Sequence, residues 1–327
     1  MRMHMRARRE WMRLGLLCLL AAITSVETAA QVQNYPTGPV KFITQLAPGG
    51  GTDPAMRVVI DGLGRMWGQQ TVLVNQPGAG GATAARAAAS AAPDGLTLYM
   101  AITSTFTVLP LAQPNLLFNV NDFVPIGFVG EVPIAIAVSP ALPVNSLPEL
   151  ISYSKQQPGG LSVAFGLRGG ITHLTAELFR IRSGADLTMV PYPGAAQAIS
   201  DVISGRVPVL IDGMAGPIAG GKLKLLAIAS PARLPFRPDV PTVAETVPGF
   251  VASGWFVLVA PPATPSAIVK KVNQDLRAVL AQPDIKEKLD ALSISTRPMS
   301  PPEVTDFIHN EEALWKPVVE RLGLATQ

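Results

Sequence analysis

The residues of this chain that are best suited to bind a ligand lie in glycine-rich loops that precede expected helices. The first loop, APGGGTD (47–53), follows an apolar run. Glycines ahead of a helix leave backbone N–H groups free, and the positive end of the helix dipole faces the same point, so such a loop favours an anion. A nucleotide phosphate is not expected, because Thr52 and Asp53 stand where a P-loop has a lysine and a hydroxyl residue.

Three more loops of this kind follow, at 77–81, 166–170 and 193–196, and the stretch 212–217 is a candidate fifth. The segment GAGGAT (78–83) comes nearest to a dinucleotide-binding fingerprint, but it ends in threonine and no acidic residue follows at the position that binds the ribose. A single glycine-rich loop usually makes only a tight turn. Four of them, each between a strand and a helix, favour a common anion site.

Few residues are available for catalysis or for metal binding. Beyond residue 30 the chain has two histidines, His173 and His309, which are far apart and lack the spacing of metal ligands, and it has no G-x-S-x-G motif. We therefore expect no cofactor, no metal site and no enzyme activity. His173 is expected to pack or to cap a helix, and Asp53 to act as a helix N-cap, since no partner for a general base is visible. Arg168 is either a solvated loop charge or a bidentate clamp for a carboxylate.

Alternating β-rich runs and helical patterns are expected to position these loops, which predicts an α/β fold with mainly parallel sheets flanked by helices. The order strand, glycine-rich loop, helix, strand, glycine-rich loop, helix, strand occurs twice, so we expect two similar lobes. The predicted strands are 40–46, 71–76, 96–103, 161–166, 187–192, 207–212 and 253–262. The predicted helices are 52–68, 82–91, 171–184, 197–205, 266–282, 284–292 and 301–323.

The last predicted strand is expected to return the chain to the first lobe. The crossings between lobes are placed near 128–134 and 248–256, and Trp255 and Trp315 are expected to pack in the core or at the hinge. Two lobes joined by two crossings are typical of a binding protein that closes about a hinge. The predicted boundaries are 32–130 plus 251–327 for the first lobe and 131–250 for the second.

The first thirty residues have the features of an export signal. Five arginines precede or flank the start of the apolar run LGLLCLLAAI (14–23), and Thr28 and Ala30 offer a small-residue cleavage site. The run is shorter than the roughly 20 residues that span a bilayer. Sec export is favoured, and RREWMR (8–13) leaves a twin-arginine route open. We therefore predict a cleaved signal peptide (1–30) and a periplasmic protein.

The chain beyond the signal carries no net charge and no cysteine. Of its 26 basic and 23 acidic residues, five and two lie in residues 1–30, which leaves equal numbers of each sign. The single cysteine, Cys18, belongs to the apolar run of the signal. A neutral chain without a basic cluster gives no indication of a nucleic-acid partner. Its 327 residues are sufficient for two domains of ordinary size.

Over nearly all of its length beyond the signal, the sequence resembles the substrate-binding proteins of tripartite tricarboxylate transporters, the TctC or Bug receptor family. The matching motifs are YPTGPVKFI, PGGGTD followed by Arg57, VNQPGAGG, AAPDGLTL, THLTAELF, VPYPGAAQAISDVISGRV, GKLKLLAIAS, PDVPTVAET, PGFVASGWFVLVAP and TPSAIVKKVN. The resemblance implies a two-lobed, Venus-flytrap fold of the periplasmic-binding-protein type, whose lobes close over a small carboxylate gripped largely by backbone N–H groups and bridging water. It also implies delivery of this ligand to membrane permease subunits, by a receptor that we expect to be a monomer.

The resemblance assigns the ligand contacts by position. The first lobe would contribute Gly49, Gly50, Gly51, Thr52, Asp53, Gly78, Ala79, Gly80, Gly81 and Ser104. The second lobe would contribute Phe165, Arg168, Gly169, Gly170, His173, Tyr192, Gly194, Ala195 and Asp212.

Departures from the family's pattern are concentrated in the second lobe. The loop FGLRGG (165–170) stands where the family usually has a small, polar S-x-G-x-G sequence, Pro193 replaces a usual lysine, and the stretch after Asp212 is a few residues shorter. We interpret these changes as an altered specificity, in which Phe165 stacks on an aromatic ring of the ligand and Arg168 pairs with a carboxylate. Two alternatives remain open: a receptor for a signalling partner, and a periplasmic enzyme on the same scaffold.

Overall fold

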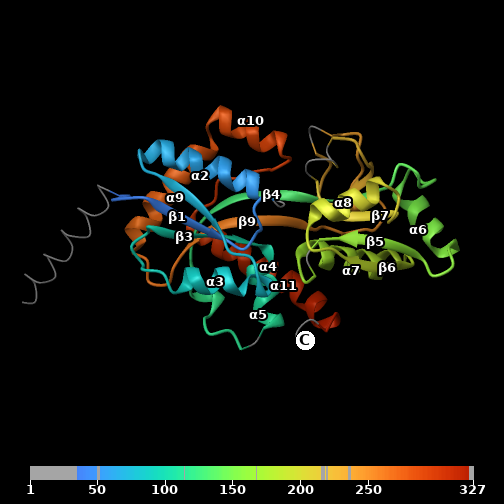
Figure 1. Ribbon diagram of the computed structural model, residues 1–327, viewed down its shortest axis with the longest axis horizontal. Helices are drawn as coiled ribbons and strands as arrows, with labels where there is room; N and C mark the ends of the chain where they lie inside the picture. The colour runs from blue at the N-terminus through green and yellow to red at the C-terminus, as the bar shows by residue number, and fades with distance from the viewer. Residues whose placement is uncertain are drawn as a thin grey trace, which may run out of the picture.

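The computed structural model describes residues 35–49, 52–113, 115–166, 168–214, 218, 220–234 and 237–323. The predicted signal peptide (1–30), Gly50 and Gly51 lie outside the described residues. All the predicted strands and helices are present in the predicted order, and the structure adds the strands Val124–Val138 and Lys224–Ile228 and the helix Leu147–Gln156, which the sequence did not predict (Figure 1). None of the helices in the described ranges combines the length and the hydropathy that a bilayer crossing requires.

The first lobe is built on three parallel strands. β1 (Val40–Thr44) pairs in parallel with β2 (Thr71–Asn75) on one side and with β3 (Thr97–Ile102) on the other. The connections are α2 (Asp53–Trp67), between β1 and β2, and α3 (Ala82–Ala89), between β2 and β3. The short elements nearby are η1 (Ala79–Gly81), α4 (Thr103–Thr107), α5 (Leu109–Ala112) and η2 (Val120–Asp122).

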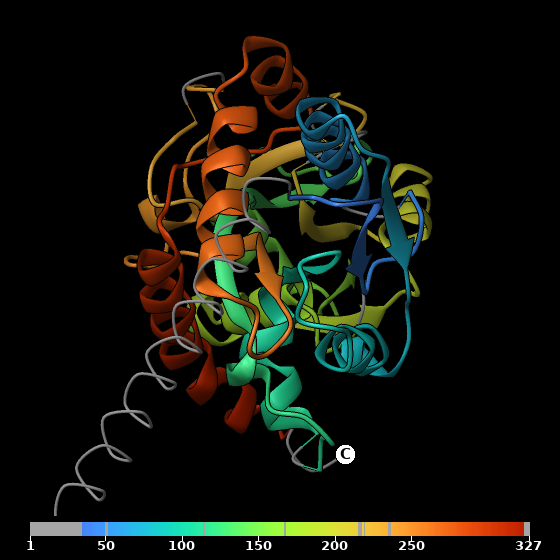
Figure 2. The same cartoon turned by 90° about the vertical axis from the view of Figure 1, so that its left-hand side faces the viewer.

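Helices cover both faces of this part of the sheet, which explains why its strands are apolar at nearly every position. Phe42 and Met100 face one core, which they share with α2, α9 (Ser266–Leu280) and α10 (Pro283–Ala291). Tyr99 faces the opposite core, which includes the alanines of α3. Figure 2 shows α9, in orange, beside α2, in blue.

The second lobe repeats the arrangement of the first. β5 (Leu161–Phe165) pairs in parallel with β6 (Leu187–Pro191) and β7 (Val209–Gly213). The connections are α7 (Ile171–Ser183), between β5 and β6, and α8 (Ala195–Ile203), between β6 and β7. The lobe also contains α6 (Leu147–Gln156), β8 (Lys224–Ile228) and η3 (Val243–Glu245). The predicted repeat of strands, loops and helices is therefore confirmed.

Two long strands, β4 (Val124–Val138) and β9 (Ser253–Ala260), join the lobes. β4 pairs antiparallel with β9 as far as Pro133, and from Ile134 onward it pairs antiparallel with β7 and β8, so it changes partners in mid-strand. The resulting order is β2-β1-β3-β9-β4-β7-β5-β6, with β8 beside β4. The predicted two-lobed α/β fold is present, and the parallel strands of each lobe meet an antiparallel centre that the sequence did not reveal.

The C-terminal helix α11 (Pro301–Arg321) is a third connection between the lobes. Its Val304 and Ile308 pack in a core of the first lobe, whereas Trp315 and Val319 pack in a core of the second. The sequence assigned the whole C-terminal segment to the first lobe. An amphipathic pattern identifies the buried face of a helix, but it does not identify which core that face meets.

One carboxylate links two buried tryptophans at this junction. Glu311 of α11 accepts hydrogen bonds from the indole N–H of Trp255, at 2.8 Å, and of Trp315, at 3.2 Å. Both indoles are buried, as predicted. Burial raises the pKa of Glu311 and nearby Glu131 adds to the rise, although the two indole donors and Arg297 oppose it. Glu311 therefore joins β9 to the helix that spans both lobes.

The substitution Glu311→Leu is expected to destabilise the protein by about 2–4 kcal/mol, because it leaves two buried indole N–H groups without an acceptor. Chemical unfolding followed by tryptophan fluorescence measures the change. Glu320→Leu, at an exposed position of the same helix, is the control and is expected to change the free energy of unfolding by less than about 0.5 kcal/mol. Equal effects of the two substitutions would contradict this role of Glu311.

Candidate functional site

The four helices that follow the glycine-rich loops begin without a side-chain cap. Gly81 precedes α3, Gly170 precedes α7 and Gly194 precedes α8, and a glycine has no side chain with which to cap. Thr52 precedes α2 and makes no capping hydrogen bond. The hydroxyl of Ser146 caps α6, whereas α9 and α10 also begin without a side-chain cap, so what distinguishes the four loop helices is their position after parallel strands. Because a side-chain cap satisfies the first N–H groups of a helix, its absence leaves these groups without a side-chain acceptor. In α3 the first of them, the Ala82 N–H, donates to the carbonyl of Ala79 instead.

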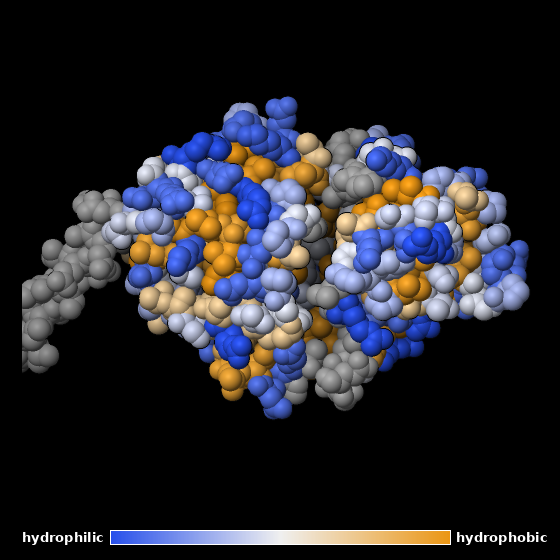
Figure 3. All heavy atoms as spheres, viewed as in Figure 1, coloured by the Kyte–Doolittle hydropathy of each residue, from blue (hydrophilic) through white to orange (hydrophobic). Residues whose placement is uncertain are grey.

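The uncapped helix starts lie in pairs, one pair in each lobe. α2 and α3 follow the carboxyl ends of the neighbouring strands β1 and β2, and α7 and α8 follow those of β5 and β6, so the two loops of each lobe lie side by side. In the space-filling view a groove separates the two lobes (Figure 3). The two lobes also touch. A Cβ atom placed on Gly169 of the second lobe, which has none, would lie 3.8 Å from Cγ1 of Val108 in the first lobe.

Asp53 is the centre of a hydrogen-bond network that shapes the first loop. Its Oδ2 accepts from the backbone N–H of Gly49 and from Nε of Arg57, both at 2.9 Å. Its Oδ1 accepts from Nη2 of Arg57, at 3.2 Å, and from Nδ2 of Asn75, at 2.8 Å, and the Asn75 amide also donates to the carbonyl of Leu46. Burial by itself raises the pKa of Asp53, but the hydrogen bonds from Arg57, Asn75 and Gly49 outweigh it, so the pKa is lowered overall.

This network corrects the role predicted for Asp53. The residue is the first of α2 and is not its cap, and the four acceptor positions of its carboxylate are all occupied by donors of the chain itself. The N–H of Gly49 is likewise used inside the loop. Arg57 and Asn75 had no predicted role in the site. The spacing of four residues between Asp53 and Arg57 on a helix was the available indication of their ion pair.

The second loop is a tight turn at 78–81, where all four residues have positive φ. Three of them are glycines, which adopt this conformation without strain, and the fourth is Ala79. The carbonyl of Ala79 accepts a hydrogen bond from Nε2 of Gln113 at 2.8 Å. Gly81 also has no room for a side chain, because a Cβ atom there would lie 2.6 Å from Oε1 of Gln45. The predicted contacts in this loop are thus backbone groups held close to Gln45.

Gln45 is the centre of a second buried network in the first lobe. Its Oε1 accepts from the hydroxyls of Tyr99 and Thr105, both at 2.7 Å, and its Nε2 donates to the hydroxyl of Ser104 at 3.1 Å. All four residues are buried. Ser104, a predicted contact, therefore lies in this network and keeps a hydroxyl hydrogen to donate. Gln45 was not predicted, because a single glutamine after a strand has no recognisable pattern.

In the second lobe, Phe165 is buried, and the prediction that it stacks on the ligand is wrong for this structure. Only 1% of its surface is exposed, and its ring stacks on His173 with the centroids 4.7 Å apart. The prediction failed because it assumed that a side chain next to a glycine-rich loop is exposed to solvent. Pairing of β5 with both β6 and β7 instead extends the strand through this residue.

His173 stabilises the loop that precedes α7. Its Nδ1 accepts the backbone N–H of Gly169 at 3.2 Å, so the ring hydrogen lies on Nε2, which is 4.0 Å from Oε1 of Glu177. Burial lowers the pKa of His173, Glu177 opposes this effect, and the exposed Arg168 adds to the lowering. The predicted packing of His173 is confirmed, whereas the alternative that it caps a helix is not, because α7 has no side-chain cap and the bond to Gly169 lies in the preceding loop.

The other predicted contacts of the second lobe differ in how far they are open to a ligand. The hydroxyl of Tyr192 donates to Asp201 at 2.7 Å and its N–H donates to the carbonyl of Phe165, so Tyr192 holds β6 and α8 together. Gly194 and Ala195, at the start of α8, are at least partly exposed. Their backbone is therefore the accessible part of this segment.

Asp212 lies near the carboxyl end of β7, and only one of its two carboxylate oxygens has a hydrogen-bond partner among the described residues. Its Oδ1 accepts the N–H of Gly213 at 2.7 Å, whereas its buried Oδ2 has no hydrogen-bond partner among the described residues. Burial raises the pKa of Asp212 to about 6, although the Gly213 N–H opposes the rise. Within the described ranges, no group of His, Cys, Asp and Glu side chains is arranged to hold a metal ion.

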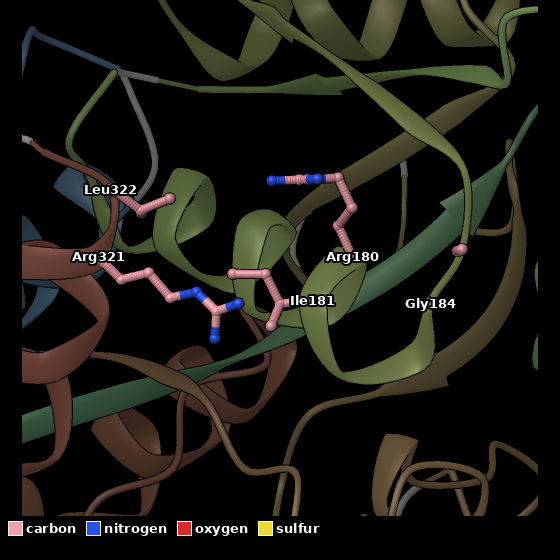
Figure 4. Close-up of a pocket in the computed structure, with 6 residues that line it drawn as sticks. Arg180, Ile181, Gly184, Arg321 and Leu322 are labelled. Carbon is pink, nitrogen blue, oxygen red and sulfur yellow. The ribbon is translucent and has the colours of Figure 1, made fainter.

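Two cavities in the described part of the chain lie away from these loops. One of about 360 Å³ lies between α7 and the end of α11, and it is lined by Arg180, Ile181, Gly184, Ala185, Arg321 and Leu322 (Figure 4). There Arg180 is already paired with Glu177. Another, of about 560 Å³, lies between β4, α9 and α11. None of the predicted contacts lines either cavity, so the candidate site is the open region where the loops of the two lobes meet.

The fold and the loops define a two-lobed solute-binding protein, and comparison with known proteins gives its family. Residues 55–324 match the family described as "Tripartite tricarboxylate transporter family receptor". The chain belongs to this family, as the resemblance of its motifs predicted.

Similar proteins agree with this assignment over almost the whole chain. Protein BugT of Bordetella pertussis is 34% identical over 316 residues, which are 95% of this chain and 97% of BugT. The structure of Rhodopseudomonas palustris Rpa4515 with adipate is 30% identical with a TM-score of 0.81, covering 89% of this chain and 98% of that one. The structure of MatC from the same organism with bound malate is 31% identical with a TM-score of 0.78, covering 87% and 100%. These similarities confirm the periplasmic-binding-protein fold.

Asp53→Ala is expected to destabilise the protein by about 2–3 kcal/mol, because it removes the acceptor of several charge-assisted hydrogen bonds. Since the pKa of Asp53 is lowered in the folded state, its stabilising contribution is present at neutral pH and is lost as the pH falls through that lowered value. The difference from the wild type should therefore shrink on acidification. Urea unfolding at several pH values measures it, with Asp61→Ala, exposed on the same helix, as the control. A difference that grows toward low pH would contradict this account.

Proposed function

We propose that this protein is a periplasmic receptor that captures a small organic carboxylate between its lobes and delivers it to a membrane permease of the tripartite tricarboxylate type. The observation that carries the proposal is the set of uncapped helix starts, two in each lobe, which offer backbone N–H donors and positive dipole ends to an anion. The adipate and malate in structures of similar proteins support a carboxylate as this anion.

The proposed binding step couples ligand capture to lobe closure. A carboxylate that bridges the lobes gains donors from both only when they approach each other, so it binds the closed form more tightly and shifts the population toward it. The segments that must deform are β4, β9 and α11, because these three connect the lobes. Ligand release at the permease then corresponds to reopening.

The internal bonding of the acidic and basic candidates supports a receptor over an enzyme. The carboxylate of Asp53 is occupied by its own chain, and the imidazole of His173 accepts a backbone N–H. Asp53 is paired with Arg57, and the carboxylate nearest to His173, that of Glu177, is 4.0 Å from Nε2, which is longer than a hydrogen bond. We further infer lobe boundaries of 32–130 plus 251–327 and 131–250, with the end of α11 packed against the second lobe although it follows the first-lobe segment. We also infer export through residues 1–30 and a monomeric receptor.

A binding carboxylate is expected to raise the melting temperature in a saturable manner and to remain chemically unchanged, because it stabilises only the folded state. Differential scanning fluorimetry with a panel of mono-, di- and tricarboxylates, aliphatic and aromatic, measures this. At a ligand concentration 100 times the dissociation constant, the stabilisation is about 2.7 kcal/mol. The matching amides are the controls. A panel without any thermal shift, together with unchanged tryptophan fluorescence, would overturn the proposal.

The variant Ala195→Pro tests the N–H groups directly. Ala195 is the first residue of α8, where proline is tolerated, and Gly194 before it already has the extended backbone that proline requires (φ −175°, ψ 164°). Removal of this one N–H is expected to weaken the tightest carboxylate of the panel about tenfold without lowering the melting temperature. Calorimetric titration measures the affinity.

The matched control is Ser266→Pro, which makes the same change at the first residue of α9, away from the loops. It is expected to leave carboxylate affinity unchanged. If both proline variants bind as the wild type does, the start of α8 does not contribute a donor.

A further inference from the structure

The position of Asp212 places its side chain beside the glycine-rich loop that follows β5. The register of β5 and β7 pairs Phe165 with Ile211, so Gly166 and Asp212 are the next residues of the two parallel strands. A Cβ atom on Gly166 would lie 3.8 Å from Oδ2 of Asp212 and 3.5 Å from Oγ1 of Thr172. Thr172 belongs to the first turn of α7. The unsatisfied oxygen and the uncapped start of α7 thus flank the same glycine.

The two oxygens of Asp212 have different surroundings. Oδ1 accepts the Gly213 N–H, while Oδ2 is buried without a hydrogen-bond partner among the described residues. No ion pair found between described residues includes Asp212. A buried carboxylate oxygen without a partner is costly, and such a group usually has a structural or functional reason. At this place in the fold, a bound molecule is the partner that the chain itself does not supply.

We propose that Oδ2 of Asp212 accepts a hydrogen bond from the ligand, and hence that this receptor selects carboxylates that also carry a hydrogen-bond donor, a hydroxyl or an ammonium group, near the carboxylate. This inference rests on the proposed function. The carboxylate occupies the N–H groups at the start of α7, and the donor on a neighbouring carbon reaches Asp212 on the other side of Gly166. A carboxylate without a donor leaves Oδ2 buried and unpaired, so it binds more weakly.

Matched ligands that differ only in the donor test the proposal on the wild-type protein. The triplets are succinate, malate and aspartate; glutarate, 2-hydroxyglutarate and glutamate; and phenylacetate, mandelate and phenylglycine. Isothermal titration calorimetry is expected to show that, in the triplet of the right size, the hydroxy or amino acid binds at least about tenfold more tightly than the parent acid. A preference for the hydroxyl alone or the ammonium alone identifies which donor Asp212 accepts.

The variant Asp212→Asn reverses the hydrogen-bonding character of this position. Its amide oxygen takes over the Gly213 N–H, so its NH₂ group replaces Oδ2 and donates where the aspartate accepted. The affinity of the donor-bearing ligand is expected to fall at least about tenfold, while that of the parent acid stays equal or rises. Asp239→Asn, the same substitution at an exposed ion pair of the same lobe, is the control and is expected to change neither affinity.

The outcomes separate this inference from the proposed function. If the parent acids bind as tightly as their hydroxy and amino derivatives, or if Asp212→Asn keeps the preference, the role of Asp212 is overturned and the carboxylate receptor stands. If no carboxylate of these triplets or of the broader panel binds, the proposed function fails and the inference falls with it.

Discussion

The rest of this structure depends on one requirement: the backbone N–H groups at the starts of α2, α3, α7 and α8 must stay uncapped and must lie at the ends of parallel strands. Each start must follow the carboxyl end of a parallel strand and must lack a side-chain cap, which is why glycine precedes three of the four helices. The parallel strands of each lobe keep two such starts side by side, and β4 and β9 bring the two pairs into one molecule. The antiparallel strands β4 and β9 therefore connect the two sheet edges at which an anion is proposed to bind. Parallel pairing alone would leave these edges in separate domains.

The two lobes prepare their loops in different ways. In the first lobe, Asp53 and Gln45 use their own hydrogen bonds to fix the loops, and Gly81 packs directly on the Gln45 amide. In the second lobe, His173 fixes the loop while Asp212 keeps one oxygen unused. The loops of the first lobe are thus held by hydrogen bonds within the chain, whereas the second lobe keeps the unpaired oxygen to which the selectivity of the receptor is here proposed to belong. This division agrees with the concentration of unusual residues in the second lobe.

The sequence predicted the order of elements, the two-lobed fold and the family, because strand and helix periodicity and the glycine positions are local signals. It did not predict the networks of Gln45 and Asn75, since a lone amide side chain acquires its partners only when distant strands meet. It misjudged Phe165 for a related reason: the ring lies at the end of a strand whose two neighbours come from later in the chain. The packing of α11 in two different cores could not be predicted either. An amphipathic pattern shows which face of a helix is buried, but not which part of the protein that face packs against.

Helix α11 also determines how the molecule can deform. In the proposed closure the lobes would rotate about the adjacent strands β4 and β9, and a helix that packs in both cores would resist this rotation. Within α11, Pro317 has no N–H to donate to the carbonyl of Ala313, so one helical hydrogen bond is missing just after the residues that pack in the first lobe, and the helix is weakest there. Because Trp315 is buried and lies two residues before Pro317, its fluorescence would report a bend of this helix during the proposed closure.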